Sequence, residues 1–183
     1  MNPLQRSTKK ESGMSLIELM IAMVVLMVGV LAVMLLIVVA IGSNVRNKRD
    51  STGTMLAEMV LDQISAIPVG ASPSIVNITD CTANSYTIDS AGSASGAGAN
   101  LSSSNIDFTQ DRASITANYS MLYTVCGASS DTRAVYDVRW NVRTITANSN
   151  FVTVAARLRN SGTDPRLFAI PVTLRTVVGN AGN

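Results

Sequence analysis

Apolar residues fill nearly every position from 14 to 41, where Ser15 and Glu18 are the polar exceptions. A helix that crosses a bilayer needs roughly 20 apolar residues in succession, and residues 19–41 alone provide 23. A buried core helix is a poor alternative, because so small a chain could not cover an all-apolar helix on every side. The run is also too long for the apolar part of a cleaved secretory signal. Residues 14–41 are therefore predicted to form a transmembrane helix.

Beyond residue 41 the pattern becomes amphipathic, and the helix is predicted to continue through residues 42–68. Pro68 should end it, and the segment between Gly42 and Gly53 is where a break in the helix is expected. The apolar positions follow i, i+3, i+4 spacing with one polar interruption: Met55, Leu56, Met59, Val60, Gln63, Ile64 and Ile67. We expect this stripe to pack on a sheet of the same domain, and the alternative is a face that binds a partner.

Residues 113–183 are predicted to form an antiparallel sheet domain, because apolar and polar positions alternate there. The strands should lie at 134–145, 151–159 and 167–178, with a strand or strand pair at 113–125. Tyr136 and Trp140 should face the core, and Pro171 indicates that its strand lies at an edge of the sheet. The fold class is therefore α+β: a long N-terminal helix, transmembrane in part, that packs on a small antiparallel sheet.

Residues 69–112 are poor in large hydrophobic side chains and rich in serine, alanine, glycine and asparagine. This composition predicts an exposed insertion before the sheet domain, with short strands near 74–79 and 86–89. Residues 90–105 read SAGSASGAGANLSSSN and are predicted to be a flexible exposed loop.

Composition narrows the chemistry that this chain can perform. It has no histidine and two cysteines, and charged residues make up 14%. The absence of histidine removes Ser-His-Asp and Cys-His catalysis and imidazole metal sites. Two cysteines cannot form a tetrathiolate zinc site. We therefore expect that the chain is not an enzyme and that it has no metal site, cofactor or small-molecule substrate.

The polar faces of the predicted strands carry arginines that could form one basic surface: Arg139, Arg143, Arg157, Arg159 and Arg175. Four environments are open for them: solvent, an acidic loop of the same fold, an acidic neighbouring subunit, or DNA. The middle of the chain is acidic, since residues 50–131 hold eight acidic side chains against Arg112. DNA is the least favoured partner, because no aromatic side chains alternate with these arginines on their face.

Cys81 and Cys126 are the two cysteines of the chain. Past a membrane helix, on the oxidising side of the membrane, they are expected to form a disulfide. Such a bond would join the serine- and glycine-rich insertion to the sheet and would contribute roughly 4 kcal/mol in the chain-entropy model.

Glu18 is the anomaly of the apolar segment, because a carboxylate inside a membrane helix costs a few kcal/mol unless it is neutralised, paired or near the interface. Residues 9–19 around it read KKESGMSLIEL. A basic leader, a glycine, the sequence S-L-I-E-L and an unbroken apolar run follow one another in this order. The arrangement resembles the processing site of type IV prepilins.

The resemblance implies that residues 1–13 are a leader peptide. It also implies that a prepilin peptidase cleaves after Gly13 and methylates the new amine of Met14. Glu18 would then support recognition and assembly by pairing with the N-terminal amine of a neighbouring subunit. An amine and a carboxylate that leave water together can offset each other's cost of desolvation.

The sequence departs from the family in two ways. Its first mature residue would be Met14, where the family has phenylalanine, and no proline interrupts the helix before Pro68. The missing proline favours a minor subunit over the main structural subunit. The stretch STGTMLAEMVLDQI at residues 51–64 further resembles the V-type minor pilins of type IV pili.

The expected function is therefore that of a minor pilin, which serves filament assembly, adhesion, motility or DNA uptake. It would lie in the bacterial inner membrane as a single-pass protein with its C-terminal domain in the periplasm, and then in the pilus. The expected partners are prepilin peptidase, other pilin subunits and the inner-membrane assembly platform. The alternatives are a minor pseudopilin of type II secretion and a membrane-anchored periplasmic binding domain.

Overall fold

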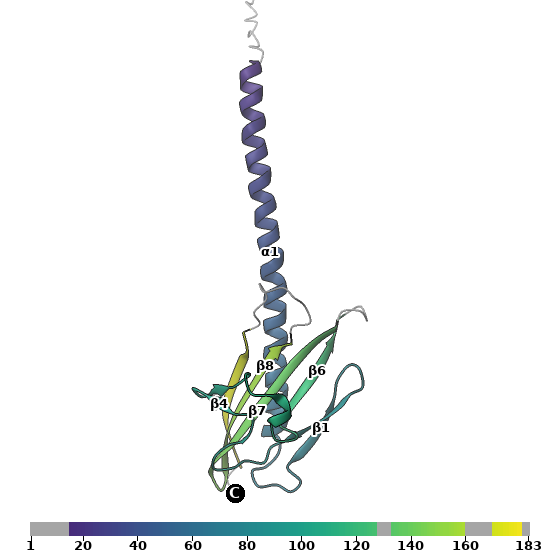
Figure 1. Cartoon of the computed structure of the whole chain (residues 1–183), viewed down its shortest axis with the longest axis vertical. Helices are drawn as coiled ribbons and strands as arrows, with labels where there is room; N and C mark the ends of the chain where they lie inside the picture. Colours follow the sequence, from purple (N-terminus) through teal and green to yellow (C-terminus); the bar gives the residue numbers. More distant parts are fainter. Residues whose placement is uncertain (1–14, 128–132, 160–169, 181–183) are drawn as a thin grey trace, which may run out of the picture. The chain divides into compact units, whose positions relative to one another are not determined.

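The computed structural model of the chain describes residues 15–127, 133–159 and 170–180. The chain divides into two compact units, Met1–Arg46 and Asn47–Asn183, each of which is described by itself. In chain order the elements are α1 (Leu16–Ser65), β1 (Ile75–Thr79), β2 (Ser85–Asp89), β3 (Ala97–Gly98), β4 (Leu101–Ser102), β5 (Asn105–Ile106), the 3₁₀ helix η1 (Arg112–Ser114), β6 (Ser120–Cys126), β7 (Arg133–Thr146), β8 (Ser149–Leu158) and β9 (Val172–Gly179) (Figure 1).

Helix α1 is continuous over 50 residues and passes through the segment where a break was expected. That expectation was wrong, because a single glycine costs only about 1 kcal/mol relative to alanine and Gly53 is buried against the sheet. The helix ends at Ser65, shortly before Pro68, as predicted.

The amphipathic stripe packs on the sheet, which confirms the favoured interpretation. Its buried apolar members are Leu56, Val60 and Ile64, joined by Ala57. Met59 is partly buried against the same core, whereas Met55 is exposed.

The main sheet has five antiparallel strands. Its order is β3-β7-β8-β9, and β6 also pairs with β7, beside β3. The predicted strands at 134–145 and 151–159 are confirmed as β7 and β8. Strand β9 is an edge strand, as expected. It begins directly after Pro171, whereas the predicted strand over 167–178 included this proline; residues 160–169 lie outside the described part. The strand predicted over 113–125 is shorter than expected, because η1 occupies its start.

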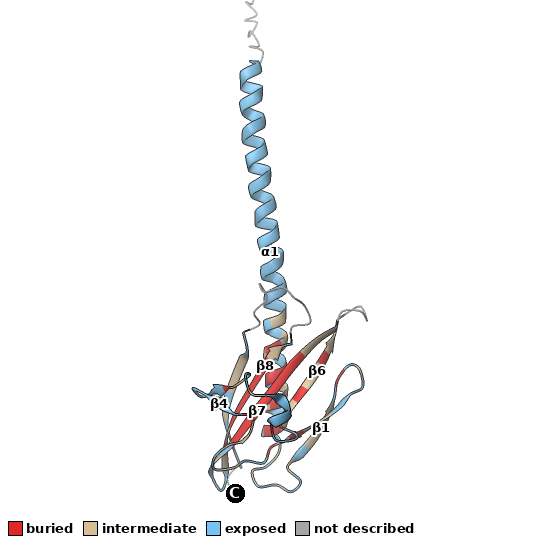
Figure 2. Cartoon of the chain, viewed as in Figure 1, coloured by how far each residue is buried: buried red, intermediate tan, exposed pale blue. Residues whose placement is uncertain are grey.

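The inner face of the sheet and the second part of α1 form the core. Buried residues gather on β7, on β8 and on the part of α1 behind them (Figure 2). Tyr136 donates a hydrogen bond to the carbonyl oxygen of Arg49 (3.1 Å), and Trp140 Nε1 donates one to the carbonyl oxygen of Asp89 (3.0 Å). Both aromatic side chains face inward, as predicted.

Part of the segment predicted as an exposed insertion over 69–112 packs on the outer face of the sheet: residues between Ala99 and Gln110 contact Asn141 and Arg139 there. The short strands expected in its first part are present as β1 and β2. The stretch 90–105, predicted to be a flexible exposed loop, contributes β3 to the main sheet. Ala99 and Ile106 are buried on the outer face, where Asn141 Nδ2 donates a hydrogen bond to the carbonyl oxygen of Ala99 (2.9 Å).

Gly98 of β3 allows this strand to approach β7 and Tyr119 closely. Its φ angle is +100°, in the region that favours glycine. A Cβ atom at this position would lie 2.5 Å from the carbonyl oxygen of Trp140 and 2.5 Å from Cδ1 of Tyr119. No L-residue side chain fits there without movement of the backbone of β7.

We predict that Gly98→Ala lowers the free energy of unfolding by about 2 kcal/mol or more, through backbone strain and overpacking. Trp140 is the single tryptophan of the chain, so its fluorescence during urea unfolding of the full chain in nonionic detergent reports this domain. Gly53→Ala is the control. Its Cβ would make ordinary contacts of 3.6 Å or more, and it should be neutral or stabilising. Equal unfolding midpoints for both variants would contradict the steric argument.

Candidate functional site

Glu18 lies in the first turn of α1. The amides of Glu18 and Leu19 donate hydrogen bonds to the carbonyl oxygen of Ser15 (3.0 and 3.1 Å), so the helix begins directly after Ser15. The N-terminus of a helix carries partial positive charge, which favours a carboxylate in its first turn. Glu18 is exposed in the structure. The predicted cleavage and methylation residues, Gly13 and Met14, lie outside the described part of the chain.

The first part of α1 exposes an apolar surface on all sides. Its large hydrophobic side chains between Leu16 and Ile41 are 47–77% exposed. By length and composition α1 is able to cross a membrane, and its most apolar 18-residue window has a mean hydropathy of 3.4 with none of its residues buried. An apolar surface of this extent is covered in the functional state by lipid or by other protein chains.

The expected disulfide is present between Cys81 and Cys126, with a Cα–Cα distance of 6.0 Å. It joins the turn between β1 and β2 to the end of β6. Asp80 reinforces this junction: its buried carboxylate accepts hydrogen bonds from the amides of Thr82 (2.8 Å), Asn84 (3.0 Å) and Thr124 (3.3 Å). Burial opposes ionisation of Asp80, but its hydrogen bonds to Thr82 and Asn84 outweigh burial and lower the pKa of the carboxyl group well below its usual range.

The five predicted arginines do not form one basic surface, which corrects that prediction. Arg139 is buried, with 4% of its surface exposed, because residues 107–110 lie against the face of β7 on which it lies. Its Nε and Nη2 atoms donate to the Asp137 carboxylate at 2.8–3.1 Å. Its charge is therefore balanced inside the fold, by a residue of its own strand rather than by an acidic loop.

The remaining four arginines lie in different surroundings. Arg157 of β8 and Arg159, which directly follows this strand, line a pocket together with Arg139. Arg175 donates a hydrogen bond to Asn105 Oδ1 (2.7 Å), and Arg143 is exposed; neither of them lines this pocket.

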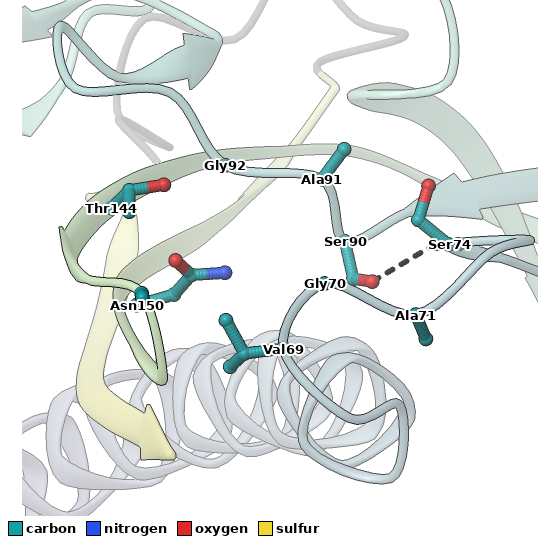
Figure 3. Close-up of a pocket in the computed structure, with 10 residues that line it drawn as sticks. Val69, Gly70, Ala71, Ser74, Ser90, Ala91, Gly92, Thr144 and Asn150 are labelled. Carbon is teal, nitrogen blue, oxygen red and sulfur yellow. Dashed lines mark hydrogen bonds between the residues drawn. The ribbon is translucent and has the colours of Figure 1, made fainter. Parts of the chain in front are cut away.

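A second pocket has an uncharged lining (Figure 3). It lies where the chain leaves α1 and meets the β7–β8 turn, and its volume is about 240 Å³. Asn150 and Thr144 direct polar groups into it, while Val69 supplies an apolar wall. Its lining holds no ionisable side chain, so the pocket offers no acid, base or charged nucleophile.

Metal ligands are not grouped in the described ranges: no cluster of three or more histidine, cysteine, aspartate or glutamate residues occurs there. Sequence reasoning missed three residues that organise the domain, namely Asp80, Phe108 and Asp137. Two of them had a detectable signal. Asp137 precedes Arg139 by two positions, which places both on one face of a strand, and Phe108 is an isolated aromatic residue after a stretch of small side chains.

Comparison with known families bears on the N-terminal segment. A family model described as the prokaryotic N-terminal methylation motif matches residues 8–34, which include Gly13, Met14 and Glu18. Searches of curated proteins and of solved structures found no match to the chain. The matched motif is the signature of type IV pilins and pseudopilins, and the helix packed on small antiparallel sheets is a pilin-like α+β fold.

The motif indicates a general class, the type IV pilins and pseudopilins. In general the motif implies processing by prepilin peptidase and association with pilin-type subunits. The apolar first part of α1 fits a membrane-anchored pilin.

We predict that Arg139→Met destabilises the domain by about 3 kcal/mol, because it leaves the Asp137 carboxylate buried without its main partner. Urea unfolding followed by Trp140 fluorescence measures this loss. Arg143→Met removes an exposed arginine from the same strand and should change stability by no more than about 0.5 kcal/mol. If both substitutions lowered the free energy of unfolding by the same amount, the buried position of Arg139 would contribute nothing to stability.

We further predict that the wild type is more stable than Asp80→Asn at pH 7 and that this difference shrinks below about pH 4. A carboxyl group with a lowered pKa stabilises the fold above its unfolded pKa, and this stabilisation is lost as the pH falls through the folded pKa. Urea midpoints at pH 7, 5 and 2.5 measure the effect. Asp62→Asn, on the exposed side of α1, should leave the acid dependence unchanged. If the difference in urea midpoint between wild type and Asp80→Asn stayed constant from pH 7 to pH 2.5, the lowered pKa of Asp80 would be refuted.

Proposed function

We propose that this chain is a minor pilin of a type IV pilus, which prepilin peptidase cleaves after Gly13 and methylates at Met14. The observation that carries the proposal is the methylation motif at residues 8–34, which overlaps the part of α1 whose large apolar side chains, from Leu16 to Ile41, are exposed. A helix of this kind resides in the bilayer before assembly and among the helices of other subunits after it. Its work is to prime or modify a filament rather than to catalyse a reaction.

Further support comes from the domain that follows the helix. Its disulfide between Cys81 and Cys126 suits an oxidising compartment such as the periplasm. In this proposal the domain faces the periplasm while the protein is anchored in the inner membrane, and it reaches the cell surface within the pilus. The partners are other pilin subunits and the inner-membrane assembly platform.

The uninterrupted helix supports a minor rather than a main structural subunit. Helix α1 continues from Leu16 to Ser65 without a proline, whereas the main structural subunits commonly have a proline in this helix. A minor pseudopilin of type II secretion is the second candidate, because it shares the same methylation motif and the same layout. The two candidates differ in the machine whose other components bind the chain.

Glu18 is assigned the role of pairing with the methylated amine of Met14 in a neighbouring subunit as that subunit enters the filament. Both groups leave water in this step, and their mutual attraction offsets the cost of desolvation. Removing one partner leaves the other charge uncompensated in apolar surroundings, which typically costs 3–5 kcal/mol.

We therefore predict that Glu18→Gln reduces the incorporation of the processed chain into sheared filaments at least tenfold. The experiment compares the amount in filaments with the amount of processed chain in the membrane, in cells that assemble type IV pili. Glu58→Gln removes an exposed carboxylate from the same helix and serves as the control, with unchanged incorporation. Normal incorporation of Glu18→Gln would contradict the proposed pairing. Recovery of the wild-type chain with secretion components, and not with pili, would favour the second candidate.

A further inference from the structure

The outer face of the sheet holds a pocket in which arginines outnumber acidic residues. Its volume is about 470 Å³, within the usual range for small-ligand sites. Strands β6, β7 and β8 form its base, and the segment around η1 forms its side. The lining residues are Gln110, Asp111, Arg112, Leu122, Asp137, Arg139, Arg157 and Arg159.

The base of this pocket is an ion pair that is already complete. Asp137 accepts hydrogen bonds from Arg139 Nε (3.0 and 3.1 Å) and Nη2 (2.8 Å). Arg139 Nη1 donates to the carbonyl oxygen of Gln110 (2.7 Å). The two charges cancel, and Arg139 is held rigidly from both ends.

Arg157 contacts Phe108 and shares the Asp137 carboxylate with Arg139 through a longer ion pair. Its guanidinium carbon lies 4.5 Å from the ring centroid of Phe108, which is a cation–π contact. Its Nη2 atom is 3.8 Å from Asp137 Oδ2, too far for a hydrogen bond. The side chain is 37% exposed, so its N–H groups are oriented and accessible to a ligand.

Arg112 and Arg159 add two further guanidinium groups to the same pocket, and both residues are exposed. Among the described residues, neither guanidinium group has a hydrogen-bond or ion-pair partner. Asp111, the second acidic residue of the lining, accepts a hydrogen bond from the amide of Ala113 (3.2 Å) at the start of η1. The lining thus has four arginines against two aspartates, which is an excess of two positive charges.

We propose that this pocket binds a dianionic phosphate group, either free phosphate or a phosphate monoester. Guanidinium groups match the oxygen atoms of phosphate through paired N–H donors. A phosphate monoester carries about −1.5 to −2 charges at pH 7, which balances the excess in the lining, whereas one carboxylate balances only half of it. Phe108 and Asp137 orient Arg157 in advance, so less conformational entropy is lost on binding. The proposal is independent of the assignment to a pilus.

The test is isothermal titration calorimetry of the full chain in nonionic detergent, free of phospholipid, at constant ionic strength. Inorganic phosphate and glycerol 3-phosphate are the probes, and tighter binding of the second would identify the ligand as a monoester. Arg157→Gln and Arg159→Gln should each weaken binding by about tenfold or more, because each removes charged hydrogen bonds. Arg143→Gln and Arg175→Gln, outside the pocket, should bind as the wild type does. Unfolding of each variant, followed by Trp140 fluorescence, shows that the domain is intact.

The pH dependence of binding distinguishes dianionic phosphate from other anions. The chain has no histidine, and so it has no side chain that ordinarily titrates between pH 5 and 8. Phosphate takes its second negative charge at about pH 6–7, so its binding should strengthen from pH 5.5 to 7.5, whereas binding of sulfate should stay constant. Binding of acetate as tight as that of phosphate would overturn the proposal. Unchanged binding of phosphate by a variant in which glutamine replaces both Arg157 and Arg159 would also overturn the proposal. Binding of duplex DNA without any binding of phosphate would also overturn it and would assign these arginines to a nucleic-acid surface.

Discussion

The apolar surface of the first part of α1 is the constraint on which the account depends. Large hydrophobic side chains between Leu16 and Ile41 are at least 47% exposed, and such a surface is unstable in water. In the proposed function, a bilayer covers it before assembly and the helices of neighbouring subunits cover it in the filament. Glu18 is the one ionisable group of this surface, so its environment distinguishes the two states.

The second unit solves a different problem, which is to bury a sheet on both faces within a short chain. The amphipathic part of α1 covers the inner face, and residues 99–110 pack on part of the outer face. Two buried polar residues on the outer face have partners: Arg139 pairs with Asp137, and Asn141 bonds to the backbone of Ala99. The buried hydroxyl group of Thr153, opposite Asn141 on β8, has no hydrogen-bond partner among the described residues. The same cover brings Phe108 against Arg157, which creates the arginine pocket.

The elements with strong local patterns could be predicted from the sequence. An apolar run that faces one environment on all sides identifies the first part of α1, and period-2 alternation identifies β7 and β8. The helix end near Ser65 followed from Pro68, and the pairing of Cys81 with Cys126 followed from the expected compartment.

The covering of the outer face could not be predicted, because it depends on contacts between residues distant in sequence. The hydrogen bond from Asn141 to Ala99 spans 42 residues, and small side chains such as Ala99 and Gly98 carry little pattern of their own. Their composition is typical of exposed loops, yet Gly98 is there because the backbone of β7 approaches it closely. The prediction for Arg139 failed for the same reason: alternation places a residue on a face but does not show what covers that face.

The most direct test of the central claim is the N-terminal sequence and intact mass of the chain, purified from membranes of cells with active prepilin peptidase. The account predicts a chain that begins at Met14 and carries one methyl group on its α-amine. A chain that still begins at Met1 in such cells would contradict the account, and it would reduce the protein to a membrane-anchored domain of another kind.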